Sequence, residues 1–67
     1  MPAIDVYLVK VFIGETEISG AYFNATVDEA GVEALGIVTA QGGDYGDIYQ
    51  LTGPDRATYF DTVTVQR

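Results

Sequence analysis

Apolar and polar side chains alternate along much of this chain, which is the pattern of β-strands that bury one face. The first segment, residues 4–13, is dense in β-branched and aromatic residues, which suit a pleated surface. Both of its faces are largely apolar, with Val6, Leu8 and Phe12 on one and Tyr7, Val9, Val11 and Ile13 on the other. We therefore predict a central strand covered on both sides, or a strand at a subunit interface.

A second strand is predicted over residues 18–27, after a turn at residues 14–17. Its inward positions are Ala21, Phe23, Ala25 and Val27, which alternate with Tyr22, Asn24 and Thr26. This alternation is typical of a half-buried strand with one wet face. The two segments together predict a β-hairpin.

A short helix is predicted next, over residues 27–35. Thr26 and Glu29 have the spacing of a capping box, in which each side chain bonds a free backbone N–H. Gly36 is placed to end the helix as its C′ residue. Because Gly31 weakens a helix interior, a hairpin followed by a strand is kept as the alternative for this segment.

Three further strands are predicted over residues 37–40, 47–52 and 57–66. A glycine-rich loop, residues 41–46, separates the first two, and a tight turn with Pro54 separates the last two. Short connections between strands favour an antiparallel sheet. We expect an α+β fold, one domain spanning residues 1–67, with a small antiparallel sheet and one short helix in the order ββαβββ. If the helix does not form, the alternative is an all-β meander or small barrel.

Composition removes much of the usual catalytic chemistry. The chain has no Cys and no His, so it lacks common nucleophiles, the commonest general base and Cys/His zinc ligands. We therefore expect no enzymatic activity, no cofactor and no bound metal. A chain this short buries about 60% of its unfolded surface. Association with a partner, or with further copies as a homo-oligomer, is the expected source of additional stability.

Charge narrows the choice of partner. Three basic residues against ten acidic ones give a net charge of −7 and a sequence pI near 4.1. Nucleic acid and anionic membranes repel such a chain, so we expect direct binding to neither. A protein with a basic surface is the expected partner. No secretory signal peptide and no apolar run of about 20 residues is visible, so the expected location is the cytoplasm of a host cell or a virion.

The glycine-rich loop also carries acidic residues. Residues 42–47 place Asp44 and Asp47 on a flexible backbone, which suits the oxygen ligands that calcium prefers. The segment is shorter than an EF-hand loop and lacks the bidentate Glu of that motif. A loop that connects two strands is therefore the main interpretation, and calcium binding is the alternative.

The strongest candidate site combines tyrosine and aspartate toward the C-terminus, at Asp44, Tyr45, Asp47, Tyr49, Tyr59 and Asp61. Tyrosine is enriched at interface hot spots, and aspartate can meet Arg or Lys of a partner. Strand alternation places Asp47 on one face with Tyr49, and Tyr59 on one face with Asp61. On adjacent strands, the two pairs form one partner-binding patch. The alternative is structural: the rings close the sheet edge over the core, and the acids face water.

These observations favour a small acidic non-catalytic interaction protein. Its Asp/Tyr face is expected to block a basic, nucleic-acid-binding site on another protein by presenting charges in place of phosphates. In size and charge, the chain is similar to small acidic inhibitors made by phages, including anti-CRISPR proteins. The alternative is a structural assembly subunit, such as a virion decoration protein, with Tyr7, Val9 and Val11 at a subunit interface.

Overall fold

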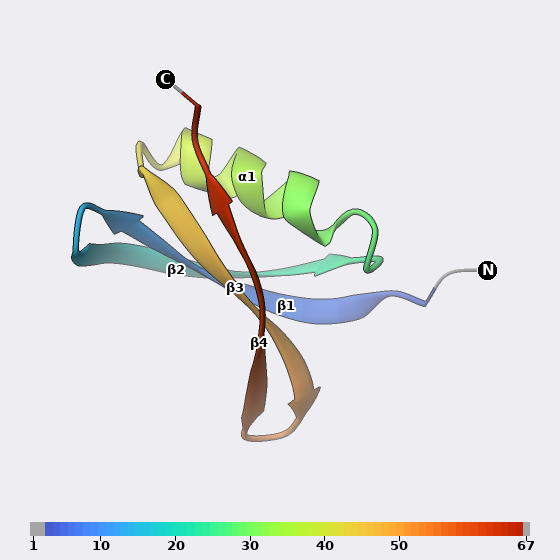
Figure 1. Cartoon of the computed structure of the whole chain (residues 1–67). Helices are drawn as coiled ribbons and strands as arrows, with labels where there is room; N and C mark the ends of the chain where they lie inside the picture. The colour runs from blue at the N-terminus through green and yellow to red at the C-terminus, as the bar shows by residue number, and fades with distance from the viewer. Residues whose placement is uncertain (1–2, 67) are drawn as a thin grey trace.

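A computed structural model of the chain describes residues 3–66. These residues form four strands and one helix in the order ββαββ (Figure 1). The elements are β1 (Asp5–Ile13), β2 (Thr16–Ala25), α1 (Ala30–Ala40), β3 (Tyr45–Gly53) and β4 (Arg56–Thr64). A small antiparallel sheet with one short helix is confirmed, with one strand fewer than the sequence predicts.

The sheet has the strand order β2-β1-β3-β4, and all three neighbouring pairs are antiparallel. A tight turn places β2 beside β1, and α1 then carries the chain across one face of the sheet to β3, on the far side of β1 (Figure 1). β1 is therefore a central strand, as its apolar composition predicts. Within residues 3–66 a helix covers one of its sides alone, so the strand is not covered on both sides by this part of the chain. The alternative, a strand at a subunit interface, stays a prediction.

The helix begins at Ala30, later than predicted. The carbonyl oxygen of Thr26 accepts hydrogen bonds from the backbone N–H groups of Glu29 and Ala30, which closes a turn before the helix. The Thr26 hydroxyl donates to Glu29 Oε1 at 3.0 Å, and no side chain caps the backbone at the helix start. The capping-box pair is thus joined side chain to side chain, and it stabilises the turn rather than the helix end.

The helix continues through Gly36 to Ala40, so the predicted strand over residues 37–40 is wrong. The buried helix positions recur every four residues, at Ala30, Ala34 and Val38. Burial of Val38 against the sheet outweighs the mild preference of a β-branched residue for a strand. The chain leaves the helix at Gly42, whose φ of 75° is the left-handed conformation that favours glycine.

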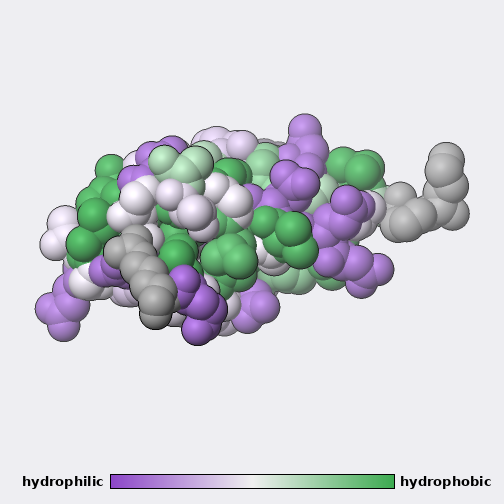
Figure 2. All heavy atoms as spheres, turned by 90° about the horizontal axis from the view of Figure 1, so that it is seen from above, coloured by the Kyte–Doolittle hydropathy of each residue, from purple (hydrophilic) through white to green (hydrophobic). Residues whose placement is uncertain are grey.

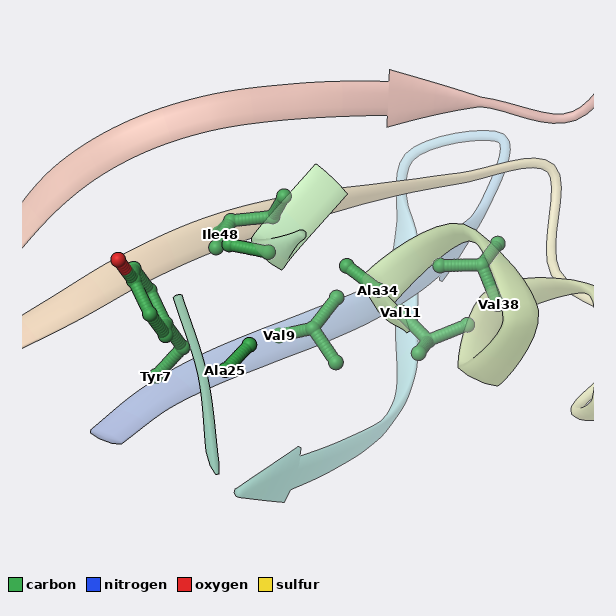
Figure 3. Close-up of a cluster of buried hydrophobic side chains, with 8 residues drawn as sticks. Tyr7, Val9, Val11, Ala25, Ala34, Val38 and Ile48 are labelled. Carbon is green, nitrogen blue, oxygen red and sulfur yellow. The ribbon is translucent and has the colours of Figure 1, made fainter. Parts of the chain in front are cut away.

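A core of apolar side chains fills the space between α1 and the sheet (Figure 3). Tyr7, Val9 and Val11 of β1 are fully buried in it. The assembly hypothesis was therefore wrong to place these three side chains at a subunit interface. The remaining core residues come from the other elements and are Ala25, Ala30, Ala34, Val38 and Ile48.

Gly46 lets the helix approach the sheet closely. A Cβ atom at this position would lie 2.6 Å from Val38 Cγ2 and 2.8 Å from Val9 Cγ2, closer than packed carbon atoms allow. Gly43 is equally confined, since its Cβ would lie 2.4 Å from Val11 Cγ1. Glycine at these positions is a packing requirement, although the sequence pattern suggests a flexible loop.

The other strands form where they are predicted, with shifted ends. The inward residues of β2 include those expected from alternation, Ala21, Phe23 and Ala25. Val27, also expected to point inward, lies beyond β2 and is 55% exposed. β3 begins at Tyr45, inside the predicted loop, because Asp44 N–H already bonds the Phe12 carbonyl and the ladder continues from there.

Candidate functional site

The side of the sheet opposite α1 carries no helix or strand of residues 3–66 (Figure 1), and we name it the open face. The strand registers assign its residues, because directly paired residues point to the same side of a sheet. β1 contributes Val6, Leu8, Lys10 and Phe12; β2 contributes Glu17, Gly20, Tyr22 and Asn24; β3 contributes Tyr45, Asp47, Tyr49 and Leu51; β4 contributes Ala57, Tyr59, Thr62 and Thr64.

One row of the open face is a continuous series of large side chains. Tyr22, Leu8, Tyr49 and Tyr59 are successive partners across the four strands, and we name them the tyrosine belt. Tyr22 is 68% exposed and Tyr59 is 57% exposed. The rings of Tyr49 and Tyr59 meet edge to face, with centroids 6.0 Å apart. Rigid rings with a polar tip, displayed on a sheet, are suited to contact with another molecule.

A cation lies at the centre of the open face. Lys10 on β1 is the direct partner of Asp47 on β3. Its Nζ atom lies 5.2 Å from the centroid of the Tyr49 ring. The ammonium group is therefore attracted by the face of an aromatic ring. Because Glu17 is the other acid on this face, the charges there nearly balance.

The row on the other side of Lys10 is also aromatic. The rings of Phe12 and Tyr45, which are partners in β1 and β3, stack with centroids 5.0 Å apart and planes 6° apart. Each ring covers part of the other, so both are half-buried. This stack and the tyrosine belt flank Lys10 and Asp47 from opposite sides.

Hydrogen bonds connect the β3 and β4 parts of the open face. Thr62 Oγ1 lies 2.8 Å from Asp47 Oδ1 and 2.7 Å from the Tyr59 hydroxyl. An ionised carboxylate can accept but not donate, so Thr62 donates its single hydroxyl proton to Asp47. The Tyr59 hydroxyl must then donate to Thr62. This chain of hydrogen bonds orients the Tyr59 ring at the end of the belt and holds the Asp47 carboxylate.

The structure brings four of the six predicted site residues together on the open face, namely Tyr45, Asp47, Tyr49 and Tyr59. Asp61 was expected on the same side as Tyr59, but a β-bulge shifts the register there and Thr62 takes that place. The Asp61 carboxylate accepts a hydrogen bond from the Thr62 backbone N–H at 2.8 Å. Asp44 lies before β3, where its Oδ2 accepts from the Gly14 N–H at 3.0 Å. The patch is therefore less acidic and more aromatic than predicted.

Sequence reasoning missed Leu8, Lys10 and Tyr22 as members of this site. Part of the signal was present, because alternation already placed Leu8 on the face of the first strand opposite the core residues. Which strands lie beside β1, and in which register, is not encoded in alternation. Thr62 was missed because a bulge leaves no mark in the hydrophobic pattern.

The helix side of the molecule is different in character. Val32 and Leu35 of α1 are 74% and 37% exposed. Acidic side chains lie close by in the sequence, with Asp28 and Glu29 just before the helix and Glu33 in its first turn. Figure 2, which views the molecule from above, shows apolar and polar residues intermixed on this side. Apolar contact and negative charge are therefore combined there, whereas the open face nearly balances its charges.

The covered face holds one polar group without a partner. The Tyr7 hydroxyl is buried and has no hydrogen-bond partner within residues 3–66. Its ring stacks on Phe23 at 5.5 Å and meets Phe60 edge to face at 5.2 Å. Burial raises the pKa of Tyr7, and the nearby carboxylate of Asp5 raises it further. The hydroxyl therefore stays protonated at neutral pH and is destabilising where it lies.

Two other kinds of chemical site are absent from residues 3–66. This part of the chain contains no pocket and no cluster of three or more acidic, His or Cys side chains that could hold a metal ion. The carboxylates considered for calcium, Asp44 and Asp47, bond to Gly14 and Thr62 respectively. The helix found there is too short to span a bilayer as an apolar segment.

Comparisons of the chain with protein-family models, curated proteins and solved structures give no match. The open face is therefore the feature from which a function is inferred. It combines exposed rings, side chains ordered by hydrogen bonds and nearly balanced charge on one side of a sheet.

Proposed function

We propose that the protein is a small non-catalytic interaction protein that binds another protein with its open face. The tyrosine belt is the observation that carries this proposal, because it presents three tyrosines in one row across a sheet. Tyrosine offers a large contact area and loses little conformational freedom on binding. The Tyr59 hydroxyl is already hydrogen-bonded and the Tyr49 ring already has Lys10 above it, which lowers the cost of ordering them.

A partner with a basic surface, such as the nucleic-acid-binding site of an enzyme, fits the overall charge. The net charge of −7 attracts a cationic protein at long range and speeds the encounter. Asp47 on the open face and the exposed Asp61 on the β4 edge are carboxylates that an Arg or Lys of the partner can reach. Bound in this way, the protein would exclude nucleic acid from the site.

Affinity capture with matched variants tests this proposal. The immobilised proteins are the wild type, Tyr49→Ala/Tyr59→Ala, and Thr58→Ala as a control on the opposite side of β4. The wild type and the control are expected to retain the same partner from an extract of cells that make the protein. Each lost ring should cost about 2 kcal/mol of binding free energy, so the double variant should retain almost none.

Two further readouts identify the mode of binding. Raised salt should weaken capture, because exposed charges are screened, and added nucleic acid should compete with the immobilised protein for the partner. If Tyr49→Ala/Tyr59→Ala retains the same partner as the wild type, the open face is not the binding surface. If nucleic acid does not compete, the partner is bound at a site other than its nucleic-acid-binding surface.

A structural assembly subunit, such as a virion decoration protein, is a second candidate function. The observation that favours it is that apolar or aromatic side chains are exposed on both broad sides of the molecule, with Tyr22 and Val6 on the open face and Val32 on the helix side. A subunit with two such surfaces can contact two neighbours. Assembly driven by apolar contact should persist at high salt, whereas a charge-steered complex weakens.

A further inference from the structure

The open face is close to electrical balance although the whole chain is strongly acidic. The chain carries a net charge of −7, but the open face sets Lys10 against Asp47 and Glu17. Other acidic residues lie in turns and around the helix, at Glu15, Asp28, Glu29, Glu33 and Asp55. Electrostatic repulsion between two copies of the chain is therefore weakest when their open faces meet.

The positions of Lys10 and Asp47 make this face complementary to itself. The two residues are direct partners on β1 and β3, the two central strands of the sheet. Consider a twofold axis that runs along the strands, midway between β1 and β3, above the open face. It places β1 of each copy over β3 of the other. Lys10 of each copy then lies over Asp47 of the other, so two contacts between opposite charges form together.

The same operation matches the aromatic positions. Leu8 of one copy lies over Tyr49 of the other, and Tyr22 lies over Tyr59 at the margins of the sheet. Aligned sheets pack face to face about 10 Å apart, with side chains of this size between them. The described chain is a slab of 34 × 25 × 15 Å, and its broad side is comparable to the roughly 800 Å² that each partner contributes to a standard interface.

We propose that, in the free protein, a second copy of the chain covers the open face in this twofold arrangement and that a binding partner displaces it. This inference rests on the proposed function, since it takes the open face as the contact surface, and it names the occupant of that face. A second copy suits the centre of this face, because Lys10 of each copy meets Asp47 of the other there.

Charge reversal at the axis tests this arrangement. In Lys10→Glu, and equally in Asp47→Lys, both contacts between the copies become contacts between like charges. Each variant alone is expected to dimerise on the order of 100-fold more weakly than the wild type, as measured by sedimentation equilibrium. An equal mixture of the two variants is expected to recover the dimer, because opposite charges then face each other between the two different chains.

Folding is controlled separately from dimerisation. The variant Lys10→Glu/Asp47→Lys keeps opposite charges both within one sheet and between copies, so it is expected to dimerise like the wild type. Circular dichroism reports whether each single variant keeps its fold. If a single variant does not fold, Tyr22→Ala removes an exposed ring of the interface without touching the core and should weaken the dimer in the same assay.

Three results would overturn the dimer: a wild type that stays monomeric over the whole concentration range, single variants that dimerise as the wild type does, or a mixture that shows no recovery. Each of these leaves the proposed function standing if partner capture still depends on Tyr49 and Tyr59. The reverse case is also distinct. If charge reversal weakens the dimer but Tyr49→Ala/Tyr59→Ala captures the partner as the wild type does, the proposed function is rejected and the contact between copies is retained.

Discussion

The two faces of the sheet are built from alternate residues of the same strands, yet they are completed in different ways. On the covered face, Val9 and Ile48 are fully buried beneath α1. On the open face, their sequence neighbours Leu8 and Tyr49 remain partly exposed. The helix therefore completes one face, and within residues 3–66 no second element completes the other.

This difference separates two kinds of specification. The covered face depends on how the volumes of its side chains fit together, because Gly46 and Ala34 leave room for side chains to interlock at close range. The open face is specified by the orientation of its rings and by charge, through the Phe12–Tyr45 stack and the bond from Thr62 to Asp47. Substitutions on the covered face should therefore change stability, and substitutions on the open face should change binding.

The largest contrast is expected between Ile48→Ala and Tyr49→Ala, which alter adjacent residues of β3 on opposite faces. Ile48→Ala leaves a cavity beneath the helix, so the free energy of unfolding should fall by about 3 kcal/mol. Tyr49→Ala removes a partly exposed ring and should cost about 1 kcal/mol. Urea unfolding at one fixed protein concentration measures both values. Equal losses would show that the two faces contribute alike to stability.

A smaller contrast is expected between Gly46→Ala and Gly20→Ala. A methyl group on Gly46 would overlap Val38 and Val9, and such overpacking should cost about 2 kcal/mol of unfolding free energy. On the open face, a methyl group on Gly20 would lie 3.7 Å from the Val9 carbonyl oxygen, an ordinary contact. That variant should be neutral or more stable by about 0.5 kcal/mol, since alanine restricts the unfolded chain. Thermal unfolding of both variants measures this contrast in stability. Similar melting temperatures would mean that α1 can shift away from Gly46.

Local patterns predicted those parts of the fold that depend on neighbouring residues. The two faces of β1 followed from alternation, because β-branched and aromatic side chains determine both the strand and its sides. The end of the helix was misplaced at Gly36 for the opposite reason. Local propensity favours a stop there, but the burial of Val38 against the sheet is a tertiary effect that no local pattern contains.

The sequence predicted several residues of the candidate site from their residue type. It did not predict which residues from other strands lie beside them. Tyr49 and Tyr59 were chosen because tyrosine is frequent at interfaces, and the structure does bring them together. Lys10 and Tyr22 join them from distant segments, through a strand order that alternation leaves open. Asp61 was lost from the site because of the bulge in β4, which interrupts the two-residue period.

Tyr7→Phe should stabilise the covered face. The substitution removes a buried hydroxyl that has no partner within residues 3–66 and keeps the ring packed between Phe23 and Phe60. Removing the desolvated group should raise the free energy of unfolding by about 1 kcal/mol. Tyr59→Phe is the matched change on the open face, where it breaks the bond to Thr62 and should lower stability slightly. A loss of stability in Tyr7→Phe would mean that the hydroxyl is hydrogen-bonded in solution.

The smallest effect concerns pH, and it depends on the buried Tyr7 of the covered face. Burial raises the pKa of Tyr7 in the folded state, so above about pH 10 the unfolded chain loses this proton before the folded chain does. The unfolded state then binds fewer protons, and stability falls as pH rises through that range, whereas the contribution is fully present below it. Tyr7→Phe should reduce this fall, because it removes the group whose pKa burial raises. Urea unfolding at neutral pH and above about pH 10 measures the slope. An equal slope in wild type and Tyr7→Phe would show that the hydroxyl reaches water in the folded protein.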